Sequence, residues 1–178
     1  MNLFKFLKSK FNKLFYSNLE ILRKSGAIIG ENCDIQIRSF GSEPWLVKVG
    51  NHVQITEGVK IFTHGGGWVL RDEYPDFDTF GRVIIGNNVY IGNDSLILPG
   101  VCIDDNVIVG AGSVVTKSIP KGWVVAGNPA RKVGTIEDFK GRMLSLNFHT
   151  KNIPNKKNII LKTKQEMFIQ KNYLVDNE

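Results

Sequence analysis

Residues 85–119 are IGNNVY, IGNDSL, ILPGVC, IDDNVI, VGAGSV and VTKSI, successive blocks that each begin with an aliphatic side chain. A strict period of six is neither the 3.6-residue period of a helix nor the period of two of a single strand, so it indicates a repeated supersecondary unit. The repeat therefore predicts a solenoid. Its aliphatic positions are Ile85, Ile91, Ile97, Ile103, Val109 and Val115.

A second position, four residues after each aliphatic one, is small or β-branched. Gly, Asn and Asp fill most of the places between the two. Aliphatic and β-branched side chains suit the interior of stacked short strands, whereas Gly, Asn and Asp suit tight corners in which φ is positive. We expect the second position to face the interior as well. Its residues are Val89, Ser95, Val101, Val107, Ser113 and Ile119.

The same frame continues upstream of the clear repeat. Val49 lies thirty-six residues before Ile85, which is six whole units, although residues 65–84 lose the pattern. We therefore predict that residues 65–84 form an excursion from one corner. The upstream aliphatic positions are Ile29, Ile35, Val49, Ile55 and Ile61, with Cys33, Ser39, Val53 and Val59 at the companion position.

Residues 28–133 resemble the hexapeptide-repeat acyltransferases, and the segment Val125–Arg131 (VAGNPAR) resembles a closing motif of that family. The resemblance implies a left-handed parallel β-helix with three strands per coil, and a homotrimer with each active site between two subunits. The handedness comes from the family alone, because parallel crossovers in general favour the right-handed connection. Period and composition predict only a parallel all-β solenoid.

Length and composition are consistent with this fold. The chain has 178 residues and 42% hydrophobic content, which predicts one domain with a real core. We expect an N-terminal amphipathic helix over residues 1–25, the β-helix over 26–133 and a helical extension over 134–178. Two cysteines, Cys33 and Cys102, are too few for a disulfide-stapled secreted fold, so we expect free thiols and a cytoplasmic protein.

The net charge of +6 is unevenly distributed. Residues 1–25 hold six Lys and Arg against one acid, residues 26–130 hold seven against eleven, and residues 131–178 hold ten against five. A nucleic-acid-binding protein usually places its basic face on the folded body, so an acidic body argues against nucleic acid.

The basic N-terminal stretch has no apolar run long enough for a signal peptide or a membrane span. Two interpretations of it remain open: a helix packed on the solenoid end or a neighbouring subunit, and a basic amphipathic helix at the anionic inner face of a membrane.

The three histidines differ in their sequence context. His52 occupies a corner position where other units carry Asn or Asp, and His149 lies outside the repeat, so we interpret both as structural. His64 ends the last regular strand before the excursion and is followed by Gly65, Gly66 and Gly67. A histidine at the lip of a rigid scaffold suits a general base, and the resemblance implies a catalytic histidine at this place.

The resemblance also implies acetyl-CoA as the donor and positions its site. Tyr90 corresponds to an aromatic residue beside the thiol end, and Asn93, Gly110 and Ala111 correspond to contacts with the pantetheine arm. Thr116, Lys117 and Arg131 correspond to contacts with the adenosine phosphates and ring, which also suits the affinity of Lys and Arg for phosphate. Lys117 follows His64 by fifty-three residues, which predicts about three coils and ~14 Å of separation.

The acceptor site has a weaker sequence signal. The excursion is rich in aromatic and acidic residues, which stack on sugars and accept hydroxyl hydrogen bonds, and this favours Trp68 and Asp72 as acceptor contacts. Residues 40–45 resemble a segment of capsule- and lipopolysaccharide-type sugar acetyltransferases, which adds Glu43. A trimer contact is an equally open interpretation of these residues.

Together these features predict a metal-independent acetyltransferase that acts on a sugar hydroxyl in surface-polysaccharide synthesis. The alternatives are a drug-modifying acetyltransferase of the same fold, an N-acetyltransferase acting on an amino sugar, a zinc carbonic anhydrase and a non-catalytic solenoid. A carbonic anhydrase needs three converging histidines, for which His52 and His149 are poorly placed. A non-catalytic solenoid gives no reason for His64 together with Lys117 and Arg131.

Overall fold

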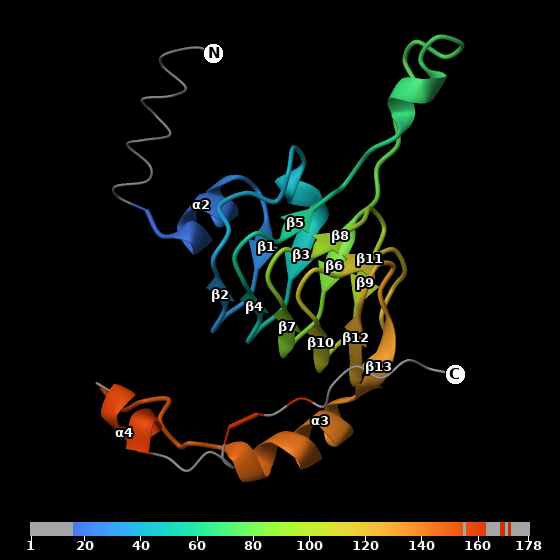
Figure 1. Cartoon of the computed structure of the whole chain (residues 1–178). Coiled ribbons are helices and arrows are strands. Elements are labelled where there is room, and N and C mark those ends of the chain that lie inside the picture. Colours follow the sequence, from blue (N-terminus) through green and yellow to red (C-terminus); the bar gives the residue numbers. More distant parts are fainter. Residues whose placement is uncertain (1–15, 155, 163–167, 170, 172–178) are drawn as a thin grey trace, which may run out of the picture. The chain divides into compact units, whose positions relative to one another are not determined.

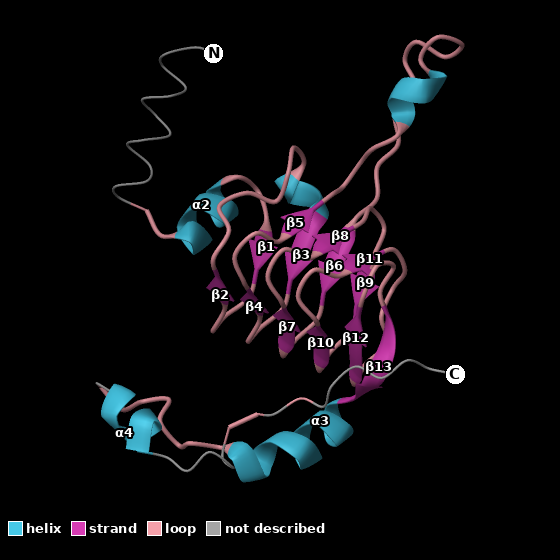
Figure 2. Ribbon diagram, in the orientation of Figure 1, coloured by secondary structure: helices cyan, strands magenta, loops and turns pink. Residues whose placement is uncertain are grey.

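The solenoid consists of three sheets of very short strands (Figure 1; Figure 2). The computed structural model describes residues 16–154, 156–162, 168–169 and 171. Sheet A contains β1 (Ile28–Ile29), β3 (Val47–Val49), β6 (Val83–Ile85) and β9 (Cys102–Ile103). Sheet B contains β2 (Asp34–Ile35), β4 (Gln54–Ile55), β7 (Val89–Ile91), β10 (Val107–Val109), β12 (Trp123–Ala126) and β13 (Arg131–Thr135). Sheet C contains β5 (Lys60–Ile61), β8 (Leu96–Ile97) and β11 (Val114–Val115).

Strands eighteen residues apart pair in parallel through the clear repeat, so each coil takes one strand from each sheet. In sheet B, Ile91 lies between Ile55 and Val109, and in sheet C, Ile97 lies between Ile61 and Val115. The predicted parallel solenoid is confirmed by this register. Short strands remain stable here because every strand inside the stack has a hydrogen-bonded neighbour above and below it.

The coil count upstream of Ile85 differs from the sequence prediction. Val49 pairs directly with Ile85 in adjacent strands, so the thirty-six residues between them make one coil and the excursion rather than two coils. Below it, Ile29 pairs with Val49 across twenty residues. Counting six-residue units therefore overestimates the number of stacked coils. The excursion adds about as many residues as one coil but adds no layer to the stack.

The interior is the predicted double row of side chains. Every aliphatic position and every companion position between Ile85 and Ile119 is at most 5% exposed. Ser95 and Ser113 lie in this interior without cost because each hydroxyl donates to the carbonyl of Gly110. Two upstream companion positions differ: Cys33 is only partly buried and Ser39 is exposed, whereas Phe40, beside Ser39, is fully buried in the core.

The corner between sheets A and B is a ladder of residues with positive φ. Asn32, His52, Asn88 and Asn106 all have φ between 54° and 56°. His52 Nδ1 lies 2.8 Å from Asn88 Oδ1, and Asn88 Nδ2 donates to Asn106 Oδ1 at 2.7 Å. The structural interpretation of His52 as a corner residue is therefore confirmed.

Helix α2 (Asn18–Lys24) packs on the first coil. It begins with a capping box between Ser17 and Glu20, and Leu22 is fully buried in the solenoid core. This supports the packed-helix interpretation for its residues, whereas residues 1–15 of the predicted N-terminal helix lie outside the described residues. None of the helices in the described part of the chain has the length and apolar character that a bilayer crossing requires.

Two irregular segments interrupt two successive coils. Residues 36–46 replace the sheet C strand of the first coil and contain the 3₁₀ turn η1 (Pro44–Leu46). The excursion follows β5, carries η2 (Gly67–Leu70) and is the green arm that leaves the solenoid in Figure 1. It closes where His64 bridges Phe80, and regular pairing resumes at Val83, inside the predicted 65–84 limits.

The C-terminal end of the solenoid is closed by a hairpin. Strand β13 turns back antiparallel to β12 through the predicted closing motif. The chain divides into two compact units at Ile136 and Glu137. Helix α3 (Ile136–Met143) starts at this division, and the second unit also contains η3 (Leu144–Leu146) and α4 (Lys157–Lys162).

Neighbouring isoleucines of β6 offer a test of this packing. Ile85 is 1% exposed and points inward, whereas Ile84 is 41% exposed on the outer face. Ile85→Ala should lower the free energy of unfolding by about 2–5 kcal/mol, because it leaves a cavity in the interior row. Ile84→Ala is the matched control and should cost less than about 1 kcal/mol. Urea unfolding measures both; equal effects would contradict the inward–outward assignment.

Candidate active site

His64 is paired with a carboxylate from another coil. Its Nδ1 lies 2.7 Å from Oε2 of Glu43, which stands at the start of η1 in the segment that replaces a strand. The two residues are distant in sequence but adjacent in space, because the segment 36–46 lies one layer below β5. The His64 side chain is 41% exposed and that of Glu43 is 15% exposed, so the imidazole is open to solvent whereas the carboxylate is largely covered.

Thr63 holds the same carboxylate from the other side. The Thr63 hydroxyl, which is 2% exposed as a residue, donates to Glu43 Oε2 at 2.5 Å. The pKa of Glu43 is lowered, first by this hydrogen bond and second by the hydrogen bond and charge of His64. Glu43 is therefore an ionised carboxylate over the whole neutral range.

The ionised carboxylate determines which nitrogen of His64 carries the proton. A carboxylate only accepts hydrogen bonds, so Nδ1 must be the donor to Glu43. In the neutral ring, Nε2 then has a free lone pair. The ring is also in contact with Phe80, with centroids 5.9 Å apart. This arrangement equips Nε2 to accept a proton from a bound molecule.

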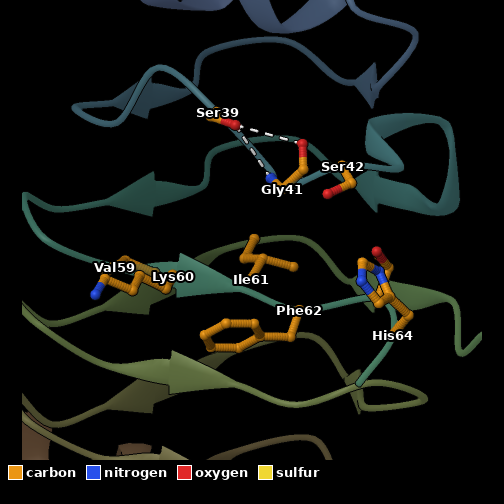
Figure 3. A pocket seen from close by; sticks show the side chains of 9 residues that line it. Ser39, Gly41, Ser42, Val59, Lys60, Ile61, Phe62 and His64 are labelled. Carbon is orange, nitrogen blue, oxygen red and sulfur yellow. Dashed lines mark hydrogen bonds between the residues drawn. The ribbon is translucent and has the colours of Figure 1, made fainter. Parts of the chain in front are cut away.

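A hollow of about 380 Å³ lies beside His64, along the outer side of β5. It exists because the first coil has no strand in sheet C, which leaves β5 as the edge strand. Figure 3 shows Lys60, Phe62 and His64 in succession along the chain, with Gly41 and Ser42 across from them. The other lining residues are Ser39, Val59, Ile61 and Thr63.

The predicted acceptor residues do not converge on this hollow. Trp68 is 81% exposed on the excursion, and Asp72 is exposed in the turn after η2. Glu43 is next to the hollow, but its carboxylate oxygen is already bound by Thr63 and His64. Acceptor binding by these three residues stays a prediction.

Of the three glycines after His64, only Gly66 has a positive φ, at 78°. A Cβ added at Gly65 or Gly66 would meet nothing within 4 Å, so the space beside the histidine is open.

The predicted pantetheine contacts lie at the corner between sheets B and C. Tyr90 is 38% exposed on the outer face of β7, between Gln54 and Ile108. Asn93 follows β7, and its carbonyl accepts the N–H of Gly112 at 2.8 Å. Gly110 has its N–H bound to Val125 and its carbonyl bound to Ser95 and Ser113, and Ala111 is an exposed residue of this turn.

The predicted phosphate contacts share a second hollow, of about 250 Å³, at the C-terminal end of the solenoid. Lys117, Arg131 and Lys132 all line it, and Lys132 lies over the Trp123 ring, 4.8 Å from its centroid. Thr116 is exposed directly before Lys117. Three cationic side chains around one hollow provide a favourable environment for phosphate.

Lys117 is closer to His64 than the sequence predicted. Both residues follow sheet C strands, and β5, β8 and β11 are consecutive neighbours. Lys117 therefore lies two strand layers above His64, or ~10 Å along the axis, rather than three layers and ~14 Å. The predicted third layer is missing because the residues counted as one more coil form the excursion.

The candidate residues thus form two groups on one chain. His64 and Lys117 share the corner that follows sheet C, whereas Asn93, Gly110 and Ala111 share the corner that precedes it. One side of the solenoid separates the two groups. A single chain does not bring the predicted base and the predicted pantetheine contacts together.

Part of the candidate site was not predicted from the sequence. Thr63 and the pairing of Glu43 with His64 had no sequence signal, because they depend on how the 36–46 segment folds. Phe62 and Lys60 had one: they alternate with buried residues and therefore face outward beside His64. Within the described residues, no group of three or more His, Cys, Asp and Glu side chains could hold a metal ion.

Comparison with known proteins finds relatives of this chain. Residues 82–117 match the family model described as bacterial transferase hexapeptide (six repeats). Protein CapG of Staphylococcus aureus is 47% identical over 165 residues, which cover 89% of this chain and 96% of that protein. Galactoside O-acetyltransferase of Escherichia coli K12 is 54% identical over 159 residues, which cover 75% and 78% of the two chains. The chain belongs to the hexapeptide-repeat acetyltransferases.

A solved member of the family has a similar fold. The structure of a galactoside acetyltransferase in complex with coenzyme A aligns with this hexapeptide-repeat acetyltransferase with a TM-score of 0.51 and 31% sequence identity. The alignment covers 77% of this chain and 80% of that chain.

The Thr63–Glu43 contact can be tested by titration. Thr63→Val keeps the shape of the side chain but removes the hydrogen bond, so the pKa of Glu43 should rise toward its ordinary value of 4.5. Because the folded-state pKa is lowered, the stability that Glu43 contributes is present above about pH 4.5 and is lost as the pH falls through the folded-state value. Carbon-13 NMR titration of Glu43 measures the shift. Thr63→Ser should retain the low pKa; an unchanged pKa in Thr63→Val would contradict the contact.

Proposed function

We propose that the protein transfers an acetyl group from acetyl-CoA to a hydroxyl of a sugar in surface-polysaccharide synthesis. The observation that carries this proposal is the His64–Glu43 pair at the lip of a hollow lined by hydroxyls and an aromatic ring. The galactoside O-acetyltransferase relative supports a sugar acceptor, and the coenzyme A complex of a similar fold supports the donor. The resemblance to capsule- and lipopolysaccharide-type enzymes supports the setting.

His64 acts as the general base in this mechanism. A sugar hydroxyl is a weak nucleophile at neutral pH, so Nε2 takes its proton as the oxygen attacks the thioester carbonyl carbon. A carbon–oxygen bond forms, the carbon–sulfur bond breaks, and His64 returns the proton to the departing thiolate. The charge on the protonated ring is stabilised by Glu43, which also keeps the ring oriented. Direct transfer needs no covalent enzyme intermediate.

The donor extends from His64 toward the C-terminal end of the solenoid. The ~10 Å between the layers of His64 and Lys117 suits an extended coenzyme, with its thioester at the base and its phosphates near Lys117, Arg131 and Lys132. These cations bind phosphate without taking part in the chemistry. Tyr90, Asn93 and Ala111, at the other corner, contact the pantetheine arm.

The two corners meet in a homotrimer. We infer that the corner with His64 on one subunit faces the corner with Asn93 and Ala111 on the next, which gives three equivalent sites around a closed threefold axis. The coil is left-handed, as in the family. This arrangement explains why one chain separates the two groups of residues.

The setting of the reaction is the cytoplasm, which suits the two free thiols, Cys33 and Cys102. Contact of the N-terminal segment with the inner face of a membrane is also part of the proposal. Measuring turnover with each acceptor distinguishes a sugar O-acetyltransferase from an antibiotic-modifying acetyltransferase and from an N-acetyltransferase that acts on an amino sugar.

Replacement of His64 tests the base. His64→Ala should lower kcat by about 10²- to 10⁴-fold, the usual contribution of a general base, while acetyl-CoA binding stays intact. His52→Ala is the control, because His52 lies at another corner and its ring Nδ1 is paired with Asn88. A thiol-release assay with a sugar acceptor measures kcat, and calorimetry measures donor binding. Unchanged turnover in His64→Ala would remove the catalytic assignment.

Replacement of Lys117 tests the donor orientation. Lys117→Ala should raise KM for acetyl-CoA by roughly 10- to 100-fold, in keeping with a lost charge-assisted hydrogen bond, and leave kcat nearly unchanged. If Lys117 binds the 3′-phosphate, the variant should be far less impaired with acetyl-CoA that lacks this group. The exposed Lys48 on β3 supplies the matched control, Lys48→Ala. Equal impairment with both donors would place the 3′-phosphate elsewhere.

A further inference from the structure

The outer side of β5, together with the residues that directly follow it, presents three different chemical groups in a row. Lys60, Phe62 and His64 alternate with the buried residues Ile61 and Thr63, so all three face outward. At ~3.3 Å per residue, the Cα atoms of Lys60 and His64 are ~13 Å apart, with Phe62 midway. All three line the hollow beside the base, and Figure 3 shows them in this order.

Each part of the hollow suits one part of a ligand. His64 can accept a hydroxyl proton at one end. Phe62, 37% exposed, offers a ring on which the apolar face of a sugar can stack, and Ser39 and Ser42 add hydroxyls from the opposite wall. At the far end, the Lys60 ammonium is exposed, and no carboxylate of the described residues lies within ion-pair distance of it.

Glu43, the carboxylate paired with His64, does not neutralise Lys60. Glu43 is held by Thr63 and His64 at the opposite end. The hollow is therefore polarised, with the base at one end and an uncompensated positive charge at the other. A neutral sugar would give the Lys60 ammonium no anionic partner. A carboxylate attached directly to the sugar ring would be too short to reach Lys60 while a hydroxyl of the same ring lies at His64, because Phe62 stands between these two side chains.

We propose that the acceptor is a sugar that carries a phosphate or diphosphate on its anomeric oxygen. Its phosphate binds Lys60, its ring stacks on Phe62, and the hydroxyl to be acetylated lies at Nε2 of His64. This inference rests on the proposed function and specifies the acceptor class. Nucleotide-linked and lipid-linked sugars share this chemistry, because both carry a phosphate at the same position.

Acceptor kinetics test the proposal. Purified full-length protein and acetyl-CoA are assayed with one panel of hexoses and N-acetylhexosamines in four forms: free sugar, sugar 1-phosphate, uridine diphosphate sugar and prenyl diphosphate sugar. The phosphorylated forms should have kcat/KM at least tenfold above the free sugar. If the sugar 1-phosphate already shows the full increase in kcat/KM, the phosphate alone is responsible. A further increase with the uridine diphosphate form or with the prenyl diphosphate form identifies whether the acceptor is nucleotide-linked or lipid-linked.

Variants of Lys60 link the preference to this side chain. Lys60→Ala should raise KM for the phosphorylated acceptor by about 10- to 100-fold and leave both its kcat and the KM for free sugar unchanged. Lys60→Arg should retain most of the preference, and Lys48→Ala, on the outer face of β3, should behave as wild type. Free sugar used as well as its phosphorylated forms, or equal losses for both in Lys60→Ala, would overturn the inference and leave the acetyltransferase function in place. No acetylation of any form by the wild-type protein would overturn both.

Discussion

The interior of the solenoid is only wide enough for inward-facing side chains from three short strands, and this constraint determines everything outside it. Within the clear repeat each inward position is small, β-branched or aliphatic, so a shift of the chain by one residue would bury polar side chains. The strand layers are therefore stacked at a fixed spacing of ~4.8 Å. Residues that follow equivalent strands, such as His64 and Lys117, are consequently held at fixed heights on one corner. Such a rigid scaffold can bind the two ends of a flexible coenzyme at a fixed separation.

The proposed chemistry depends on the first of the two segments that interrupt the coils. The first coil takes twenty residues instead of eighteen and has the irregular segment 36–46 in place of a sheet C strand, so sheet C begins one layer later than sheet B. The gap exposes the edge of β5 and brings Glu43 against Thr63 and His64. An ionised carboxylate, an imidazole oriented by it and the hollow beside them thus arise from a single departure from the repeat.

The sequence predicted the features that repeat and missed those that occur once. The period of six predicted the interior rows, the parallel stacking and the corner role of His52, because each depends only on local alternation and turn chemistry. It overestimated the number of coils, since an excursion equal in length to a coil leaves the frame unchanged. The pairing of Glu43 with His64 could not be predicted, because it depends on the path of an irregular segment. Family resemblance identified the residues around the second hollow, but their separation from His64 became clear only from the strand order.

The central claim is that the active site is built from two corners on two subunits, and mixed trimers test it most directly. His64→Ala removes the base from one corner, and Ala111→Tyr blocks the opposite corner; each homotrimer should be inactive. Random mixing of the two chains at equal amounts should restore about a quarter of wild-type activity, because each mixed closed trimer contains one interface with both corners intact. A mixture as inactive as its two components would show that the site lies within a single subunit and would contradict the account.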